Sequence, residues 1–150
     1  MSDLSDLYQE VILDHNKSPR NFREITGMAH RAIGHNPLCG DKVTVYVKLD
    51  GDIVREVSFT GSGCAISKAS ASMMTEALAG KTRLEVDNMF TLFHDLVTGK
   101  PLGDDAADEL GKLVVFSGVR EFPVRVKCAS LAWHTMRAAL DDMQETTSTE

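Results

Sequence analysis

The sequence predicts an α+β domain in which one small antiparallel β-sheet packs against helices. Three observations carry this prediction: a run with period-2 alternation, a turn followed by a second such run, and helical periodicity on both sides of them. Strands followed by most of the helices are typical of α+β proteins. The chain of 150 residues has the length of about one domain, so we assign residues 1–143 to a single domain and residues 144–150 to a frayed polar C-terminal tail.

The first half of the chain is predicted to form a helix and then a β-hairpin. Apolar residues recur at helical spacing from Leu4 to Ile12, and we expect this helix to stop before Pro19. A linker of polar residues follows it. Residues 43–49 and 53–59 each alternate between apolar and polar side chains, and a turn rich in Asp and Gly separates them. This pattern predicts two antiparallel strands.

The second half of the chain is predicted to be mostly helical. Apolar residues at helical spacing cover 66–78 and 86–97, and a glycine shortly after each run is expected to end the helix. Residues 100–118 are acidic and broken by glycines, so no element is assigned there. Pro123 precedes a final helix, whose apolar residues within 129–143 fall on one stripe.

Composition and charge exclude several classes of protein. Apolar residues make up 43% of the chain and charged residues 25%, which is ordinary for a globular protein. No apolar run approaches the roughly 20 residues that cross a bilayer. The acidic N-terminus does not resemble a secretion signal, and a formal net charge of −6 disfavours binding to nucleic-acid phosphates. We therefore expect a cytoplasmic protein that binds neither nucleic acid nor a membrane.

Three cysteines fall at junctions between the predicted elements. Cys39 lies in the loop before the hairpin, Cys64 follows a Gly-Ser-Gly turn at a helix start, and Cys128 is placed at the start of the last helix. Helix N-termini favour the thiolate, which binds metals and attacks sulfur. Alternatively, each cysteine is a small buried apolar residue. An odd count in a reducing compartment favours metal binding or thiol chemistry over disulfides.

Asp41 completes a candidate metal site. It lies two residues after Cys39 at the start of a strand, so its carboxylate and the thiol can face the same point. Together, Cys39, Asp41, Cys64 and Cys128 supply three sulfur ligands and one oxygen ligand. Zinc accepts this tetrahedral set, and iron could also be held by the thiolates. Asp41 could instead be a turn acceptor with no metal.

Basic residues before the last cysteine could offset the charge of this site. Three thiolates and one carboxylate around a divalent ion leave a net negative charge. Arg125 and Lys127 lie two residues apart in a segment that reads as extended, so we expect both side chains to point the same way. Each could alternatively belong to a solvated basic surface. Of the histidines, His35 could reach the Cys39 loop but is interpreted as structural, and His134 is interpreted as solvent-exposed or as decorating the helix surface.

The segments around the cysteines resemble those of a known family. They are similar to SufU-type proteins, a branch of the IscU/NifU-like iron–sulfur assembly family, over essentially the whole chain. The motifs are NPLCGD (36–41), GSGCAIS (61–67) and VRVKC (124–128). The resemblance implies the SufU/IscU-like fold and one zinc bound by Cys39, Asp41, Cys64 and Cys128.

The resemblance also implies a zinc-dependent sulfurtransferase. Cys39 would accept sulfur as a persulfide from a cysteine desulfurase of the SufS type, Arg125 would support the transfer, and a downstream iron–sulfur assembly complex would follow. IscU-type scaffolds carry histidine where this chain has Lys127, and they lack the extra length at about 93–118. Both differences favour sulfur transfer over the alternative, a scaffold that assembles a [2Fe–2S] cluster. A purely structural zinc domain is a third interpretation, which the aspartate ligand disfavours.

Overall fold

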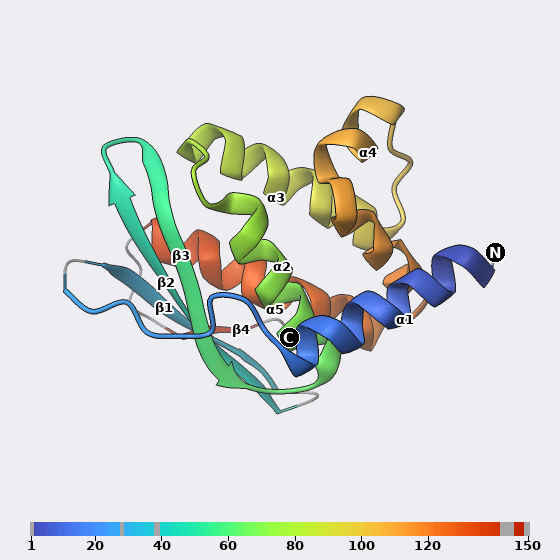
Figure 1. Cartoon of the computed structure of the whole chain (residues 1–150), viewed down its shortest axis with the longest axis horizontal. Coiled ribbons are helices and arrows are strands. Elements are labelled where there is room, and N and C mark those ends of the chain that lie inside the picture. Colours follow the sequence, from blue (N-terminus) through green and yellow to red (C-terminus); the bar gives the residue numbers. More distant parts are fainter. Residues whose placement is uncertain (1, 28, 38–39, 142–145, 149–150) are drawn as a thin grey trace.

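A layer of helices covers one face of a β-sheet (Figure 1). The computed structural model describes the backbone of residues 2–27, 29–37, 40–141 and 146–148, and the side chains of that set from residue 8 to residue 141. The elements are α1 (Ser2–Lys17), β1 (His30–Asn36), β2 (Asp41–Asp50), β3 (Ile53–Ser62), α2 (Ala65–Leu78), α3 (Arg83–Thr98), α4 (Asp104–Leu110), the 3₁₀ helix η1 (Gly111–Glu121), α5 (Pro123–Leu140) and β4 (Thr146–Ser148).

The sheet has the strand order β3-β2-β1-β4, and its first three strands are antiparallel. β2 and β3 form the predicted hairpin, in which Val45 lies opposite Phe59 and also opposite Ala32 of β1. These three side chains are buried, and α2 and α5 pack against the sheet (Figure 1). The predicted α+β class is therefore confirmed, with the expected antiparallel sheet and helical cover.

β1 was not predicted, because the sequence analysis placed a polar linker there. Its buried positions alternate as Ala32, Gly34 and Asn36, which are not residues that favour strands. Gly34 lies directly against Thr135 of α5, and a side chain at position 34 would collide with it. A strand built from small and polar residues gives little hydrophobic signal, although its pairing with β2 is continuous along its length.

The short strand β4 falls within residues 144–150, which were predicted to form a frayed polar tail. Thr146 to Ser148 pair in parallel with β1, opposite Ile33 to His35. The sheet thereby gains a fourth strand from the end of the chain, beside the strand that the sequence analysis had also missed.

The predicted helices at 66–78 and 86–97 correspond to α2 and α3. α3 begins with a capping box between Thr82 and Glu85 and ends at Gly99, whose φ of 85° suits glycine. The unassigned region 100–118 forms α4 and most of η1. It packs against α1, α3 and α5 and buries the side chain of Phe116.

α5 forms the centre of the helical layer and is buried on almost every side. The Trp133 ring stacks on Phe93 at a centroid distance of 4.3 Å, and its Nε1–H donates to Ser70 Oγ at 3.2 Å. His134 is half-buried against Phe90 because α3 covers that face, so the predicted exposure of His134 is wrong. Among the described helices, none is both long and apolar enough for a membrane span.

Candidate metal centre

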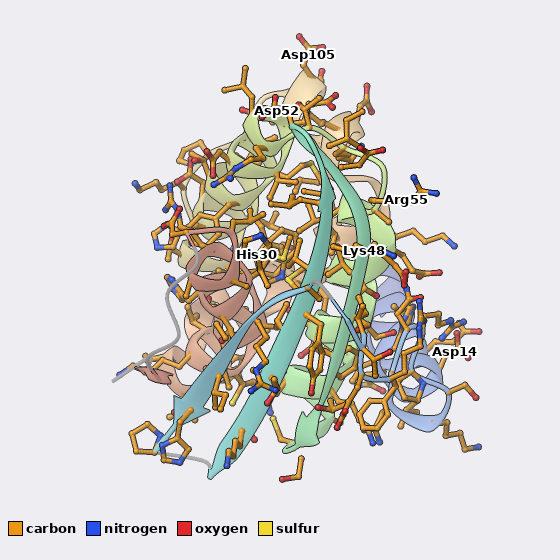
Figure 2. The ribbon with its side chains drawn as sticks, turned by 90° about the vertical axis from the view of Figure 1, so that its left-hand side faces the viewer. Asp14, His30, Lys48, Asp52, Arg55 and Asp105 are labelled. Atoms are coloured by element: carbon orange, nitrogen blue, oxygen red, sulfur yellow. The ribbon has the colours of Figure 1, made fainter. Side chains whose placement is uncertain are left out.

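Three of the four predicted ligands converge at one end of the sheet. A carboxylate oxygen of Asp41, Cys64 Sγ and Cys128 Sγ all lie within 4.8 Å of one another. Asp41 is the first residue of β2, so the cluster lies at the end of the hairpin opposite its tip, where Figure 2 shows Asp52. The three residues come from a strand and from two helices, α2 and α5, which are far apart in the sequence.

Asp41 is fully buried and is oriented by the start of α2. Its Oδ1 accepts a hydrogen bond of 2.8 Å from the Cys64 backbone N–H, and its Oδ2 lies 3.7 Å from Cys64 Sγ. A buried carboxylate is costly unless it is paired or bound to a cation. The second oxygen faces the Cys64 thiol. This arrangement suits a metal ion that is bound by both side chains.

The Gly-Ser-Gly turn allows α2 to approach this carboxylate closely. Gly61 has a φ of 145°, and a Cβ there would collide with the backbone of Lys42. A Cβ on Gly63 would lie 2.6 Å from Asp41 Oδ1, although the backbone at Gly63 is not left-handed. Both glycines are therefore required by close approach, one to the neighbouring strand and one to the metal-site carboxylate.

Cys64 caps the N-terminus of α2. Its Sγ accepts a hydrogen bond of 3.4 Å from the Ser67 backbone N–H, and the side chain is half-buried. A hydrogen bond with Cys128, together with backbone hydrogen bonds, lowers the pKa of Cys64 to about 7, against burial and the Asp41 charge, which raise it. Cys64 therefore deprotonates to its thiolate near neutral pH, as expected for a thiol at a helix start.

Cys128 is not at the helix start where the sequence analysis placed it. α5 begins at Pro123, so Cys128 lies in its second turn, where its side chain is buried. Its Sγ accepts a hydrogen bond of 3.7 Å from Nδ2 of Asn36, the last residue of β1. Asn36 is a fully buried polar residue of the centre that the sequence analysis did not single out, although it opens the motif containing Cys39.

The prediction that Arg125 and Lys127 point the same way is wrong. Both lie in α5, where two residues are separated by roughly 200° around the helix axis. Arg125 is exposed, and its guanidinium lies 4.4 Å from the centroid of the Phe122 ring, whereas Lys127 is half-buried. The helix therefore separates the two cations that an extended segment would have brought together.

The predicted fourth ligand, Cys39, lies outside the described residues. Described residues on both sides of Cys39 lie at the centre. Asn36 donates a hydrogen bond to Cys128 Sγ, and Asp41 is one of the three candidate metal ligands. The Gly40 backbone N–H donates to the Asn36 carbonyl at 2.9 Å. His35, which precedes this segment, is exposed on β1, and it is not among the residues that meet at the centre.

Tyr8 of α1 is a further residue near the centre. Burial raises the pKa of its hydroxyl, the charge of Arg125 lowers it, and the charges of Cys64 and Cys128 raise it. These effects place the hydroxyl within electrostatic range of the cysteine cluster. The sequence analysis assigned Tyr8 only to the first helix, where its ring packs against Phe116 of η1.

Comparison with known proteins identifies the family of this chain. Residues 7–129 match the sequence profile of the NifU-like N terminal domain. The chain belongs to this family. It is 44% identical over 138 residues to the "Zinc-dependent sulfurtransferase SufU" of Bacillus subtilis, which covers 90% of both chains. It is 38% identical over 140 residues to the "Iron-sulfur cluster assembly scaffold protein IscU" of Streptococcus pyogenes, covering 93% of this chain and 86% of the relative.

Solved structures agree with the fold. A candidate iron–sulfur cluster assembly scaffold of the SUF system from Fervidobacterium islandicum superposes on this member of the family with a TM-score of 0.76 and 37% identity, covering 89% of this chain and 96% of the other. The family resemblance seen in the motifs is therefore confirmed: the chain is a SufU/IscU-like protein of iron–sulfur cluster assembly.

Proposed function

We propose that this chain is a zinc-dependent sulfurtransferase that takes persulfide sulfur from a cysteine desulfurase of the SufS type. The observation that carries the proposal is the meeting of Asp41, Cys64 and Cys128 within 4.8 Å of one another. The 44% identity to a relative named as a zinc-dependent sulfurtransferase supports it. The sulfur would pass to a downstream iron–sulfur assembly complex in the cytoplasm.

The donor set fits zinc. Two sulfur donors and a buried carboxylate converge, and Cys39 would add a third thiol from the segment that ends at Asp41. Zinc, when bound, would keep these thiols deprotonated at neutral pH. The carboxylate and Cys64 are already held together by the hydrogen bond from the Cys64 N–H, so the protein pre-arranges part of this ligand set.

Cys39 is the proposed sulfur acceptor. Its thiolate would attack the outer sulfur of the desulfurase persulfide, so that a new S–S bond forms on Cys39 and the old S–S bond breaks. The donor cysteine leaves as a thiolate, and the transfer involves no net oxidation or reduction. Cys64 and Cys128 are held by helices, whereas Cys39 belongs to a connection between strands, where a side chain can move with less disturbance of packing.

Arg125 is proposed to support the transfer through its charge. Its exposed guanidinium is held over the Phe122 ring, on the outside of the helix that carries Cys128. There it can attract an anionic persulfide without closing the centre to a partner. Lys127 lies on another side of the helix and is not assigned this role.

A scaffold that assembles a [2Fe–2S] cluster on the same residues is the alternative function. The relatives named as scaffolds in Streptococcus pyogenes and Thermotoga maritima favour it. The family resemblance places histidine in such scaffolds where this chain has Lys127, which favours sulfur transfer instead. Because three thiols and an aspartate could hold either metal, metal content decides between the two functions.

Metal analysis of the isolated protein tests the proposal. We expect about one zinc per chain and a colourless solution, since zinc has no d–d absorption. Asp41→Ala should lose zinc, whereas Asp52→Ala, a matched change at the exposed hairpin turn, should retain it. A brown protein with stoichiometric iron and acid-labile sulfide would contradict the proposal in favour of the scaffold.

A further inference from the structure

Asn36 brings a buried hydrogen-bond donor to the metal centre. It is the last residue of β1 and lies directly opposite Asp41 in the antiparallel pairing of β1 with β2. Side chains of residues that are paired in this way point to the same face of a sheet. Both side chains are fully buried, so the amide of Asn36 and the candidate carboxylate ligand enter the interior from neighbouring positions on the same face.

A direct contact joins this amide to one of the clustered thiols. Nδ2 of Asn36 lies 3.7 Å from Sγ of Cys128 and donates a hydrogen bond to it. The amide oxygen could not take the place of Nδ2 beside a thiolate, because a thiolate only accepts hydrogen bonds. The backbone of Asn36 is fixed as well, since its carbonyl accepts a hydrogen bond of 2.9 Å from the Gly40 N–H. The donor is therefore held in place by the end of the strand.

The two thiols of the centre obtain these hydrogen bonds from different parts of the fold. Cys64 caps α2, and its Sγ accepts a hydrogen bond of 3.4 Å from the Ser67 backbone N–H. Only the first turn of a helix has N–H groups left over for such a cap. Cys128 lies in the second turn of α5, after Val126, whose N–H already donates to the Phe122 carbonyl at 3.0 Å. A side chain from β1 therefore gives Cys128 what the helix start gives Cys64.

We propose that Asn36 is a positioning residue of this centre, whose side-chain N–H holds the Cys128 sulfur at the metal. The proposal rests on the proposed function, because it concerns the metal that Asp41, Cys64 and Cys128 would bind. A hydrogen bond to a metal-bound thiolate takes up part of its negative charge and fixes its orientation. Asn36 supplies this bond without adding a full charge to a buried site. Cys128 is thereby an anchoring ligand, tied to the sheet as well as to its own helix.

The test compares Asn36→Leu with Asn21→Leu. Leucine keeps the branched shape of asparagine and excludes water from its place, but it has no donor. Asn21 is the matched control, because it is half-buried and its Nδ2 donates to Thr75 Oγ1 at 3.0 Å, at the end of α2 opposite to Cys64. Each full-length protein is loaded with Co²⁺, whose sulfur-to-metal charge-transfer band reports on the bound thiolates. Zinc affinity is measured by competition with a chelator.

We expect the two variants to differ in the charge-transfer band. Without the hydrogen bond the sulfur electrons lie higher in energy, so the band of Asn36→Leu should move to longer wavelength than that of the wild type. Its zinc affinity should fall roughly 10- to 100-fold, as for other residues that support metal ligands. Asn21→Leu should lower the melting temperature, because Asn21 has a left-handed φ of 57°, yet keep the wild-type band and zinc affinity.

An unchanged band in Asn36→Leu would overturn the assignment even if zinc affinity fell, because that loss would then be structural. If Asn36→Leu does not fold, the isotope-labelled wild type decides by NMR. Loaded with a spin-active cadmium isotope, it should show scalar coupling between the metal and the Asn36 amide protons, and the absence of this coupling would overturn the proposal. Failure of the proposed function is distinguishable, because a wild-type protein isolated with an iron–sulfur cluster would contradict that function while the cobalt band still reports on Asn36.

Discussion

At the scale of single residues, Asp41 defines the centre more than any one thiol does. Among the three candidate metal ligands that converge in the described part of the chain, it is the only carboxylate, and it is fully buried at the start of β2. One of its oxygens is held by the Cys64 N–H, while the other faces the Cys64 thiol. The acid is thus positioned by the helix start that Cys64 caps, and the pKa of Cys64 is lowered chiefly by its hydrogen bond with Cys128 and further by backbone hydrogen bonds.

Arg125 gives the first prediction at this scale. Arg125→Ala should retain zinc, because the residue is exposed and is not among the clustered donors. Sulfur transfer should fall roughly 10- to 100-fold, corresponding to about 1.4–2.7 kcal/mol of lost transition-state stabilisation. Arg125→Lys should recover only part of the rate, because an ammonium lacks the planar fork of donors. The rate of persulfide transfer is measured for the wild type and for both Arg125 variants.

The matched control for Arg125 is Arg55→Ala. Arg55 is an exposed arginine on β3, near Lys48 and away from the start of β2 in Figure 2, and it lies 3.4 Å from Asp50. Its removal should leave transfer unchanged. If Arg125→Ala also transfers sulfur at the wild-type rate, Arg125 has no part in the reaction.

At the scale of elements, the turn between β3 and α2 sets the distance from helix to carboxylate. Gly63→Ala would place a methyl group 2.6 Å from Asp41 Oδ1, so the carboxylate or the helix must move. We expect weaker zinc binding and a loss of about 1–3 kcal/mol in the free energy of unfolding, as for other overpacked sites. Zinc competition with a chelator and urea unfolding measure the two effects.

Gly118→Ala is the control for this change. Nothing lies within 4 Å of a Cβ at Gly118, and its φ is not positive, so alanine should change the free energy of unfolding by less than about 1 kcal/mol and leave zinc binding intact. Equal zinc affinities in Gly63→Ala and Gly118→Ala would show that close approach at Gly63 does not position Asp41.

The packing of α3 against α5 gives a prediction on pH. Burial lowers the pKa of His134, and the charges of His94 and Arg137 lower it further. Below the unfolded-state pKa of about 6.5, the unfolded chain binds a proton that the folded chain resists, so stability is present above that pH and is lost as the pH falls. His134→Gln should therefore lose less stability than the wild type between about pH 7.5 and 5.5.

Urea unfolding of both metal-free proteins at the two pH values checks this expectation, because zinc release would otherwise add its own pH dependence. His15 has a pKa lowered in the same direction, chiefly by burial, so the variant should keep part of the wild-type pH dependence. A variant that loses as much stability as the wild type would contradict the role given to His134.

At the scale of the whole molecule, most of the fold could be predicted where periodicity was strong. The hairpin and the helices α1, α2 and α3 follow from apolar spacing and from the turn and capping residues. β1 could not be predicted, because its inward positions are Ala, Gly and Asn, and its pairing depends on contacts with β2 and α5. The unassigned region became α4 and η1 through packing on α1 and α3, which no local pattern encodes.

The site was predictable in residue type but not in geometry. The motifs named Asp41, Cys64 and Cys128, which do converge. An extended segment before Cys128 was inferred where α5 had already begun, because Pro123 was taken as preceding the helix and not as its first residue. Asn36 could not be assigned to the centre, since its contact with the Cys128 thiol exists only in the folded chain.

The central claim is that Cys39 accepts sulfur, and one measurement tests it most directly. The zinc-loaded protein is incubated with a cysteine desulfurase and cysteine, alkylated, digested and analysed by peptide mass spectrometry. The proposed mechanism predicts added sulfur on the Cys39 peptide and none on the peptides of Cys64 or Cys128, because those two thiols remain with Asp41 at the centre. Added sulfur on Cys64 or Cys128, or a Cys39→Ser variant that still stimulates the desulfurase normally, would contradict it.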